Sequence, residues 1–363
     1  MAAQRRRKSG RSAVEGPRSA GVFACATGSL DSVHDDRVLV VTLRQRRVTT
    51  SPAPFPHAVS PAAPPFFIIA GPTAAGKSDI AIAVAARCGG EIVGADAFQV
   101  YRGLDLLTAK PPPEFLTRVP HHLIGEIPLT QPFDVAQYLR AASRRIAEIN
   151  ARGCVPIVVG GTGLYLRALM RGLADLPGAD ADLRARLESQ PLADLQRQLL
   201  ELDPTAAAQL DSQNPRRVIR ALEVCLLTGR PFSGFRAEWS GPPSGVSGVV
   251  LTRDRPTLLA RIERRTEAMF AAGVVEEVRA AGEIGPTAGQ ILGLREIRTH
   301  LAGGLSRADC IAAIRLATRQ YAKRQMTWFR REAALTPIDL GSADPAQLTE
   351  RLAALIASPP ATA

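Results

Sequence analysis

The sequence contains a phosphate-binding motif whose position in the chain strongly limits the possible folds. The motif matches Gly-x4-Gly-Lys-Ser and consists of Gly71, Pro72, Thr73, Ala74, Ala75, Gly76, Lys77 and Ser78. Residues 66–70 before it are apolar and have the length of a buried strand, and residues 79–86 after it read as a helix. Strand, glycine-rich loop and helix in this order are the context that a phosphate-binding loop requires. We therefore expect an α/β fold with a P-loop-type parallel sheet flanked by helices.

The residue types in this loop indicate what it binds. Its backbone N–H groups and the start of the following helix can point at phosphate oxygens, and Lys77 adds a full positive charge. The hydroxyl of Ser78 is placed to hold a Mg²⁺ ion shared with the ligand. The alternative is a glycine-rich turn without a ligand. The motif predicts a polyphosphate or pyrophosphate ligand and does not tell whether ATP is involved.

Two further predicted strands end in polar or glycine-rich segments. Residues 91–95 read as a strand that ends at Asp96, and residues 156–159 read as a strand followed by the turn 160–163. Open α/β sheets bind their ligands at the carboxyl ends of the strands, so both segments are expected beside the phosphate loop. Taken alone, Asp96 has an equally simple interpretation as the cap of a turn or helix.

Composition favours a polyanionic partner and a reducing compartment. The chain has 363 residues and a formal charge of +11, but residues 1–64 hold ten Lys/Arg against four Asp/Glu, which leaves only about +5 elsewhere. The five cysteines are scattered without a Cys-x-x-Cys pair, which indicates free thiols and a cytoplasmic protein. No apolar stretch approaches the roughly 18 residues of a membrane span, so no membrane partner is expected.

The chain divides into segments of different character. Residues 1–64 are basic and proline-rich, and we expect a disordered extension that is either a targeting segment or the product of an upstream start codon. The predicted domains that follow are 65–174 as the first part of the P-loop core, 175–243 as a helical insertion domain, 244–340 as the continuation of the core with further helices, and 341–363 as a C-terminal helix and tail.

Several other segments carry a resemblance to a known family. Residues 98–111, 120–124, 158–165, 214–224 and 318–330 follow the phosphate loop in an order that resembles the tRNA dimethylallyltransferases, also called tRNA isopentenyltransferases. The resemblance extends from about residue 66 to residue 330. It implies transfer of a dimethylallyl group from dimethylallyl pyrophosphate to N6 of the adenine on the 3′ side of the anticodon in tRNA, with Mg²⁺ as cofactor. It also implies that the helical insertion lies over the active site, and we expect a monomer.

The resemblance implies roles for particular residues. Asp96, Thr162 and Arg265 are the expected catalytic residues, with Asp96 as the base that accepts the adenine amine proton. Arg265 lies on a predicted helix at residues 257–270, where it shares a face with Arg261. An ordinary solvated basic face is the alternative explanation for these two arginines.

The segments expected to contact tRNA fall into four groups. They are Asp96, Ala97, Phe98 and Gln99; Arg216, Arg217, Val218, Ile219 and Arg220; Gln290, Ile291, Leu292, Gly293, Leu294 and Arg295; and Lys323, Arg324, Gln325, Met326, Thr327, Trp328, Phe329 and Arg330. The last group ends a predicted helix at residues 309–331, on which Arg315, Arg319 and Lys323 recur every fourth residue and could follow a phosphate backbone.

Two other functions stay open at the level of sequence. Prenylation of free adenine nucleotides, as in the related adenylate isopentenyltransferases, would use the same loop, but the long basic C-terminal region argues against a small acceptor. An ATP-dependent kinase or NTPase is favoured only by the phosphate loop.

Overall fold

The computed structural model describes residues 65–238 and 247–357. The predicted extension at 1–64 therefore lies outside the described residues, as do residues 239–246 and the end of the predicted tail.

A six-stranded parallel sheet forms the centre of the described chain, which confirms the predicted α/β class. Its strands are β1 (Phe67–Ala70), β2 (Gly90–Ala95), β3 (His121–His122), β4 (Val155–Gly160), β5 (Ser247–Thr252) and β6 (Thr336–Asp339). They lie in the order β3-β2-β4-β1-β5-β6, so β1 is flanked by β4 and β5. All of β1 is buried, as expected for a central strand covered on both faces.

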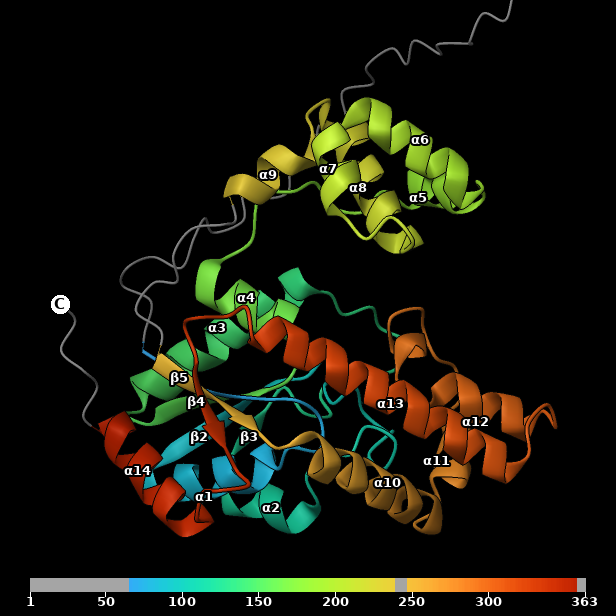
Figure 1. Ribbon diagram of the computed structural model, residues 1–363. Helices are drawn as coiled ribbons and strands as arrows, with labels where there is room; N and C mark the ends of the chain where they lie inside the picture. The colour runs from blue at the N-terminus through green and yellow to red at the C-terminus, as the bar shows by residue number, and fades with distance from the viewer. Residues whose placement is uncertain (1–64, 239–246, 358–363) are drawn as a thin grey trace, which may run out of the picture. The chain divides into compact units, whose positions relative to one another are not determined.

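Helices cover both faces of this sheet (Figure 1). On one face, α1 (Lys77–Cys88) and α14 (Pro345–Ala357) pack on Phe67 and Ile69 of β1. On the other, α3 (Val135–Ala151) and α4 (Gly163–Arg171) share a core with Ile68 and Ala70. Because successive side chains of a strand point to opposite faces, the four residues of β1 serve both cores. The short helix α2 (Pro113–Arg118) lies beside α1.

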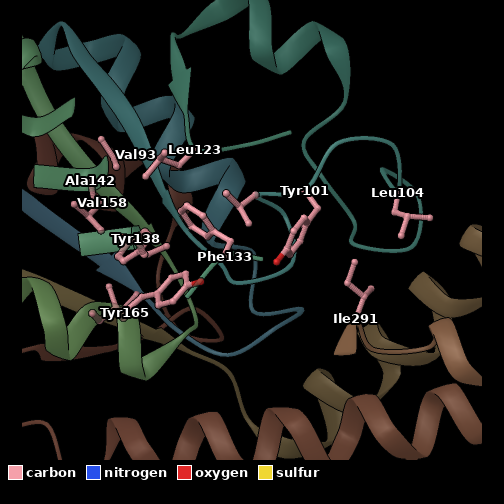
Figure 2. Close-up of a cluster of buried hydrophobic side chains, with 14 of the residues drawn as sticks. Val93, Tyr101, Leu104, Leu123, Phe133, Tyr138, Ala142, Val158, Tyr165 and Ile291 are labelled. Atoms are coloured by element: carbon pink, nitrogen blue, oxygen red, sulfur yellow. The ribbon is translucent and has the colours of Figure 1, made fainter. Parts of the chain in front are cut away.

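The core beneath α3 and α4 continues into the C-terminal helices. These are α10 (Arg255–Ala271), α11 (Val274–Ala280), α12 (Leu294–Leu301) and α13 (Arg307–Phe329), with the 3-10 turn Ala288–Gln290 between α11 and α12. Tyr138 of α3 stacks on Tyr165 of α4 with ring centroids 3.9 Å apart, and Figure 2 shows this pair in the same cluster as Tyr101 and Ile291. One continuous apolar core therefore holds the sheet and α13 together.

Arg315 and Arg319 do not form the free phosphate-facing stripe that their spacing suggested. Arg315 pairs with Glu267 and Arg319 pairs with Glu263, so the two arginines bind carboxylates of α10, on which α13 packs. Glu263 and Glu267 are themselves four residues apart and match the arginine spacing. This part of the predicted basic face is therefore an interhelix ion-pair ladder.

The helices between α4 and β5 have their own core. They are α5 (Ala181–Glu188), α6 (Leu192–Leu202), α7 (Pro204–Gln209), α8 (Pro215–Thr228) and α9 (Phe232–Glu238). Leu187, Leu195 and Leu222 are buried together at their centre. These helices occupy the segment that was predicted to be a helical insertion domain. The placement of this insertion over the active site stays a prediction.

Candidate active site

The strand order brings the predicted site residues to one edge of the sheet. Strands β2, β4, β1 and β5 are neighbours, and the ends of the first three are in register, with Ala95 and Ala70 both aligned with Gly160. Asp96, the turn with Thr162 and the phosphate loop therefore leave the sheet side by side. Segments separated by more than 60 residues in sequence meet at this edge.

The backbone of the phosphate loop requires glycine at its two motif positions. Gly71 has φ of 152°, and a Cβ atom there would lie 2.3 Å from the carbonyl oxygen of Leu251 in β5. Gly76 has φ of 101° and caps the start of α1 in the left-handed region. Ala74 adopts the same region with φ of 64°, which costs a non-glycine residue about 1 kcal/mol or more. The surrounding structure stabilises this conformation.

Two arginines provide part of that support. Arg253, just after β5, donates from Nε to the carbonyl of Ala75 at 2.8 Å, and Arg261 of α10 donates from Nε to the carbonyl of Ala74 at 2.7 Å. Both arginines bind carbonyl oxygens of the loop, so neither of them occupies a loop N–H group, although the N–H groups of Thr73 and Ala75 have partners within the protein. Arg265 follows Arg261 by one turn of α10, so the shared face of the two arginines belongs to the site and is not a solvated surface.

The side chain of Lys77 folds back onto the phosphate loop. Its Nζ donates to the carbonyl of Pro72 at 2.9 Å. Burial lowers the pKa of Lys77 to about 8, against the opposing effect of the Asp96 carboxylate, while the nearby Arg265 lowers it further. The three charged groups thus lie within electrostatic reach of one another, and an arriving anion would favour the protonated amine.

Thr162 fixes the backbone on both sides of Asp96. Its N–H donates to the carbonyl of Ala95 at 3.2 Å, and its Oγ1 accepts from the N–H of Ala97 at 3.0 Å. The Oδ1 atom of Asp96 accepts from the N–H of Phe98 at 2.9 Å. The turn-cap interpretation of Asp96 is therefore correct for one oxygen of the carboxylate. The same hydrogen bond holds the carboxylate in a fixed orientation.

Asp96 and Arg265 line one cavity together with Thr73 of the phosphate loop. Apolar side chains form much of the remaining wall; they are Phe98, Leu107, Met269, Ile291, Leu292 and Ile314. A carboxylate, a guanidinium and a phosphate loop thus meet beside an apolar surface. Burial lowers the pKa of Arg265, partly offset by Asp96, so the arginine is a partly desolvated cation.

A loop of this cavity is held by Glu277, which the sequence did not single out, and by Gln99. Glu277 of α11 accepts from the N–H groups of Leu106 and Leu107 at 2.8 and 2.9 Å. The amide of Gln99 donates to the carbonyls of Thr108 and Ala109 at 3.1 and 2.8 Å. Gln99, predicted to contact tRNA, therefore uses its amide nitrogen inside the protein.

The structure separates the predicted tRNA-contacting residues into exposed and buried sets. The exposed members are Arg216, Arg217, Gln290, Arg295, Lys323, Arg324, Thr327 and Arg330. The buried members are Val218, Ile219, Ile291, Gly293, Leu294, Gln325 and Phe329, and the partly buried members are Asp96, Ala97, Phe98, Gln99, Arg220, Leu292, Met326 and Trp328. Each block runs along a helix or turn and includes its inward face, so the fully buried side chains are not available to RNA. We restrict the predicted side-chain contacts accordingly.

The predicted Mg²⁺ site has few protein ligands among the described residues. Ser78, the second residue of α1, is partly buried beside Lys77, and no cluster of three or more acidic, His or Cys side chains suited to a metal exists in residues 65–238 and 247–357. Mg²⁺ commonly keeps several waters and binds through substrate phosphates with one or two protein ligands. The residues present fit that kind of site.

Comparison with known proteins shows the family. Residues 99–332 match the family described as IPP transferase. A tRNA dimethylallyltransferase of Geobacter sulfurreducens is 45% identical over 278 residues, covering 74% of this chain and 89% of the relative, and one of Geobacter metallireducens is 47% identical over 279 residues. The chain therefore belongs to the IPP transferase family of tRNA dimethylallyltransferases, as the sequence resemblance implied.

Solved structures agree with this assignment. The full-length tRNA isopentenylpyrophosphate transferase of Bacillus halodurans is 36% identical, with a TM-score of 0.60 over 81% of this chain and 96% of that one. A eukaryotic dimethylallyltransferase captured acting on tRNA is 26% identical, with a TM-score of 0.66 over 80% of this chain and 77% of that one. Within the described residues, every helix is too short or too polar to cross a membrane.

Proposed function

We propose that this protein transfers the dimethylallyl group of dimethylallyl pyrophosphate to N6 of the adenine on the 3′ side of the anticodon in tRNA, releasing pyrophosphate. The observation that carries the proposal is that Asp96, Arg265 and Thr73 of the phosphate loop line one cavity. A group that can accept a proton and a site for a departing anion are thus available to the same substrate pair.

The leaving group is the reason for a phosphate loop in a transferase. As the bond between C1 and the pyrophosphate oxygen breaks, negative charge grows on the pyrophosphate. The loop, whose backbone Arg261 holds at Ala74, and the cations Lys77 and Arg265 beside it would stabilise that charge where it develops. Mg²⁺ held by Ser78 and the pyrophosphate oxygens would neutralise part of the same charge.

The acceptor is activated by Asp96, which lines the same cavity. The exocyclic amine of adenine is a weak nucleophile because its lone pair is delocalised into the ring. As N6 bonds to C1, one of its protons passes to the carboxylate of Asp96, whose turn is fixed by Thr162. The apolar wall containing Met269 and Ile314 suits the five-carbon chain and limits water at the reacting carbon.

The exposed basic residues at the end of α13 suit a tRNA acceptor. Lys323, Arg324 and Arg330 are exposed there, and the guanidinium of Arg324 lies 5.7 Å from the ring centroid of Tyr321. These cations can bind backbone phosphates, while the target adenine leaves its loop stack at a cost of a few kcal/mol. We propose a cytoplasmic monomer, because the described site is built within one chain and its four described cysteines are free thiols.

A direct assay tests this proposal. The protein is incubated with dimethylallyl pyrophosphate and unmodified tRNA, and the nucleosides are then analysed by mass spectrometry alongside released pyrophosphate. N6-dimethylallyl adenosine at the position next to the anticodon, in equal amount to pyrophosphate, is the expected result. Prenylation of AMP in preference to tRNA would support the nucleotide prenyltransferase alternative. ATP hydrolysis without any prenylated product would support an NTPase.

A further inference from the structure

A single buried side chain of α13 connects two segments of the active site. Gln325 is 6% exposed, and its Oε1 accepts from the N–H of Thr73 in the phosphate loop at 2.8 Å. Its Nε2 donates to the carbonyl of Gly161, in the turn after β4, at 2.9 Å. Gln325 is separated from these partners by 252 and 164 residues in sequence.

The contact with the turn is specific for this side chain. A Cβ atom on Gly161 would lie 2.3 Å from Nε2 of Gln325 and 2.9 Å from the carbonyl oxygen of Gly71. The amide therefore occupies the space beside a bare backbone, between the loop and the turn. Only a side chain with both a donor and an acceptor satisfies Thr73 and Gly161 together, and leaving either group buried without a partner is costly.

The two segments joined by Gln325 carry the two halves of the chemistry. Thr73 belongs to the loop that receives the leaving group, whereas Gly161 precedes Thr162, which fixes the backbone around Asp96. A shift of the loop relative to the turn would change the separation between the pyrophosphate site and the base. Displacements of about 1 Å in such geometries can reduce rates by about 100-fold.

We propose that Gln325 is a positioning residue for the prenyl transfer: its amide sets the placement of the phosphate loop relative to the turn that holds Asp96. The inference rests on the proposed function. It assigns to the inward face of α13 a role different from that of its outward face, where Lys323 and Arg324 are available to tRNA.

A Gln325→Met variant tests the loss of both hydrogen bonds at nearly constant side-chain size. Steady-state kinetics with dimethylallyl pyrophosphate and tRNA should show kcat reduced by about 10- to 100-fold. The KM and the binding constant for tRNA should stay within about twofold of the unmodified protein, because Gln325 does not reach the RNA-facing surface. A tRNA affinity lost in parallel with turnover, or an unchanged kcat, would overturn the proposal.

A Gln325→Glu variant supplies a readout that a general packing defect would not give. Its carboxylate can still accept from Thr73 but repels the carbonyl of Gly161, whereas the protonated acid restores the donor. The ratio of its kcat to that of the unmodified protein should therefore rise as pH falls from 7.5 to 5.5. Using this ratio removes any pH dependence that both proteins share through the ionisable groups around the site, which are Lys77, Asp96, Arg265 and Tyr321. A flat ratio, with Gln325→Met equally flat, would contradict the assignment.

A matched control separates positioning from stability. Gln196 of α6 also donates from its amide to a backbone carbonyl, that of Ser212 at 2.7 Å, and is partly buried. Gln196→Met should leave kcat within about twofold while its melting temperature falls about as much as that of Gln325→Met. If the unmodified protein itself makes no prenylated tRNA, the proposed function fails. If it is active and Gln325→Met matches it, only the role of Gln325 fails.

Discussion

The indole of Trp328 lies against Gly163 so closely that a Cβ atom on Gly163 would be 2.4 Å from its Cδ2. Gly163 is the first residue of α4 and follows Thr162, while Trp328 lies in the last turn of α13. This packing lies one turn along α13 from the hydrogen bond of Gln325 to Gly161. Two adjacent contacts therefore fix α13 on the turn that carries Thr162.

Gly163→Ala should destabilise the protein by about 1 to 3 kcal/mol, because the added methyl group overlaps the Trp328 ring and a well-packed contact cannot absorb it. Denaturant unfolding measures the change. Gly234→Ala in α9 is the matched control, since nothing lies within 4 Å of the added atom there. In a Trp328→Ala background the penalty of Gly163→Ala should largely disappear; a penalty of equal size in both backgrounds would exclude the clash as its cause.

Asp96→Asn should lower the single-turnover transfer rate by about 100-fold or more, because the amide cannot accept the N6 proton. The fold should be preserved, since an Asn Oδ1 can still accept from the N–H of Phe98. Binding of dimethylallyl pyrophosphate and tRNA should change little. A variant that keeps full activity would show that another group removes the proton.

The affinity for dimethylallyl pyrophosphate should fall as pH rises above about 8. Burial lowers the pKa of Lys77 to about 8, so the unliganded amine is protonated below this value and neutral above it. Pyrophosphate favours the protonated form, so its binding constant should weaken by up to about tenfold per pH unit above the pKa. Equilibrium binding from pH 6.5 to 9.5 checks this.

Two variants complete the pH experiment on Lys77. Lys77→Met should bind weakly at every pH, and Lys77→Arg should lose the inflection near pH 8 because its guanidinium stays charged. An inflection of the same size in Lys77→Met would assign the titration to another group. The stability of the unliganded protein should change with pH in the opposite direction to the affinity. Because the pKa of Lys77 is lower in the folded state than the ordinary 10.5, the unfolded chain binds more protons, and the free energy of unfolding rises as pH increases from about 8.

Neutralising Lys323, Arg324 and Arg330 together should reduce the slope of log affinity for tRNA against log salt by roughly two to three units. Turnover at saturating tRNA should stay near that of the unmodified protein. A control that neutralises Arg118, Arg140 and Arg144, which are exposed on α2 and α3, should change the slope by less than one unit. Equal slopes for the two triple variants would remove the end of α13 from the RNA interface.

The sequence was sufficient to place the phosphate loop, Asp96 and Thr162 at one edge of a parallel sheet. Each of these three sites follows an apolar stretch that reads as a strand. The carboxyl ends of parallel strands meet at the same edge of a sheet, so the three sites are expected together there. The supporting contacts of Arg253 and Glu277 could not be predicted in this way. Each depends on which distant carbonyl or N–H group the fold brings within reach, and neither residue lies in a recognisable motif.

For the predicted tRNA-contacting residues at the end of α13, helical periodicity could have shown which side chains are buried. Ile314, Thr318, Ala322, Gln325 and Phe329 recur at the spacing of one helix face and are all buried. This pattern already places Gln325 on the inward face, although a contiguous basic block suggests a surface. What it cannot give is the identity of the partners, because Thr73 and Gly161 are neighbours of Gln325 only in the folded protein.

The position of β1 between β4 and β5 has a consequence during synthesis. One partner of β1, β4, leaves the ribosome before the insertion, but the other, β5, begins only at Ser247. A nascent chain that ends within α5 to α9 therefore exposes one long side of its most apolar strand, and unpaired strand edges promote association between chains. The edge closes only once β5 has been synthesised and pairs with β1, so the length of the insertion sets the time for which the edge stays open.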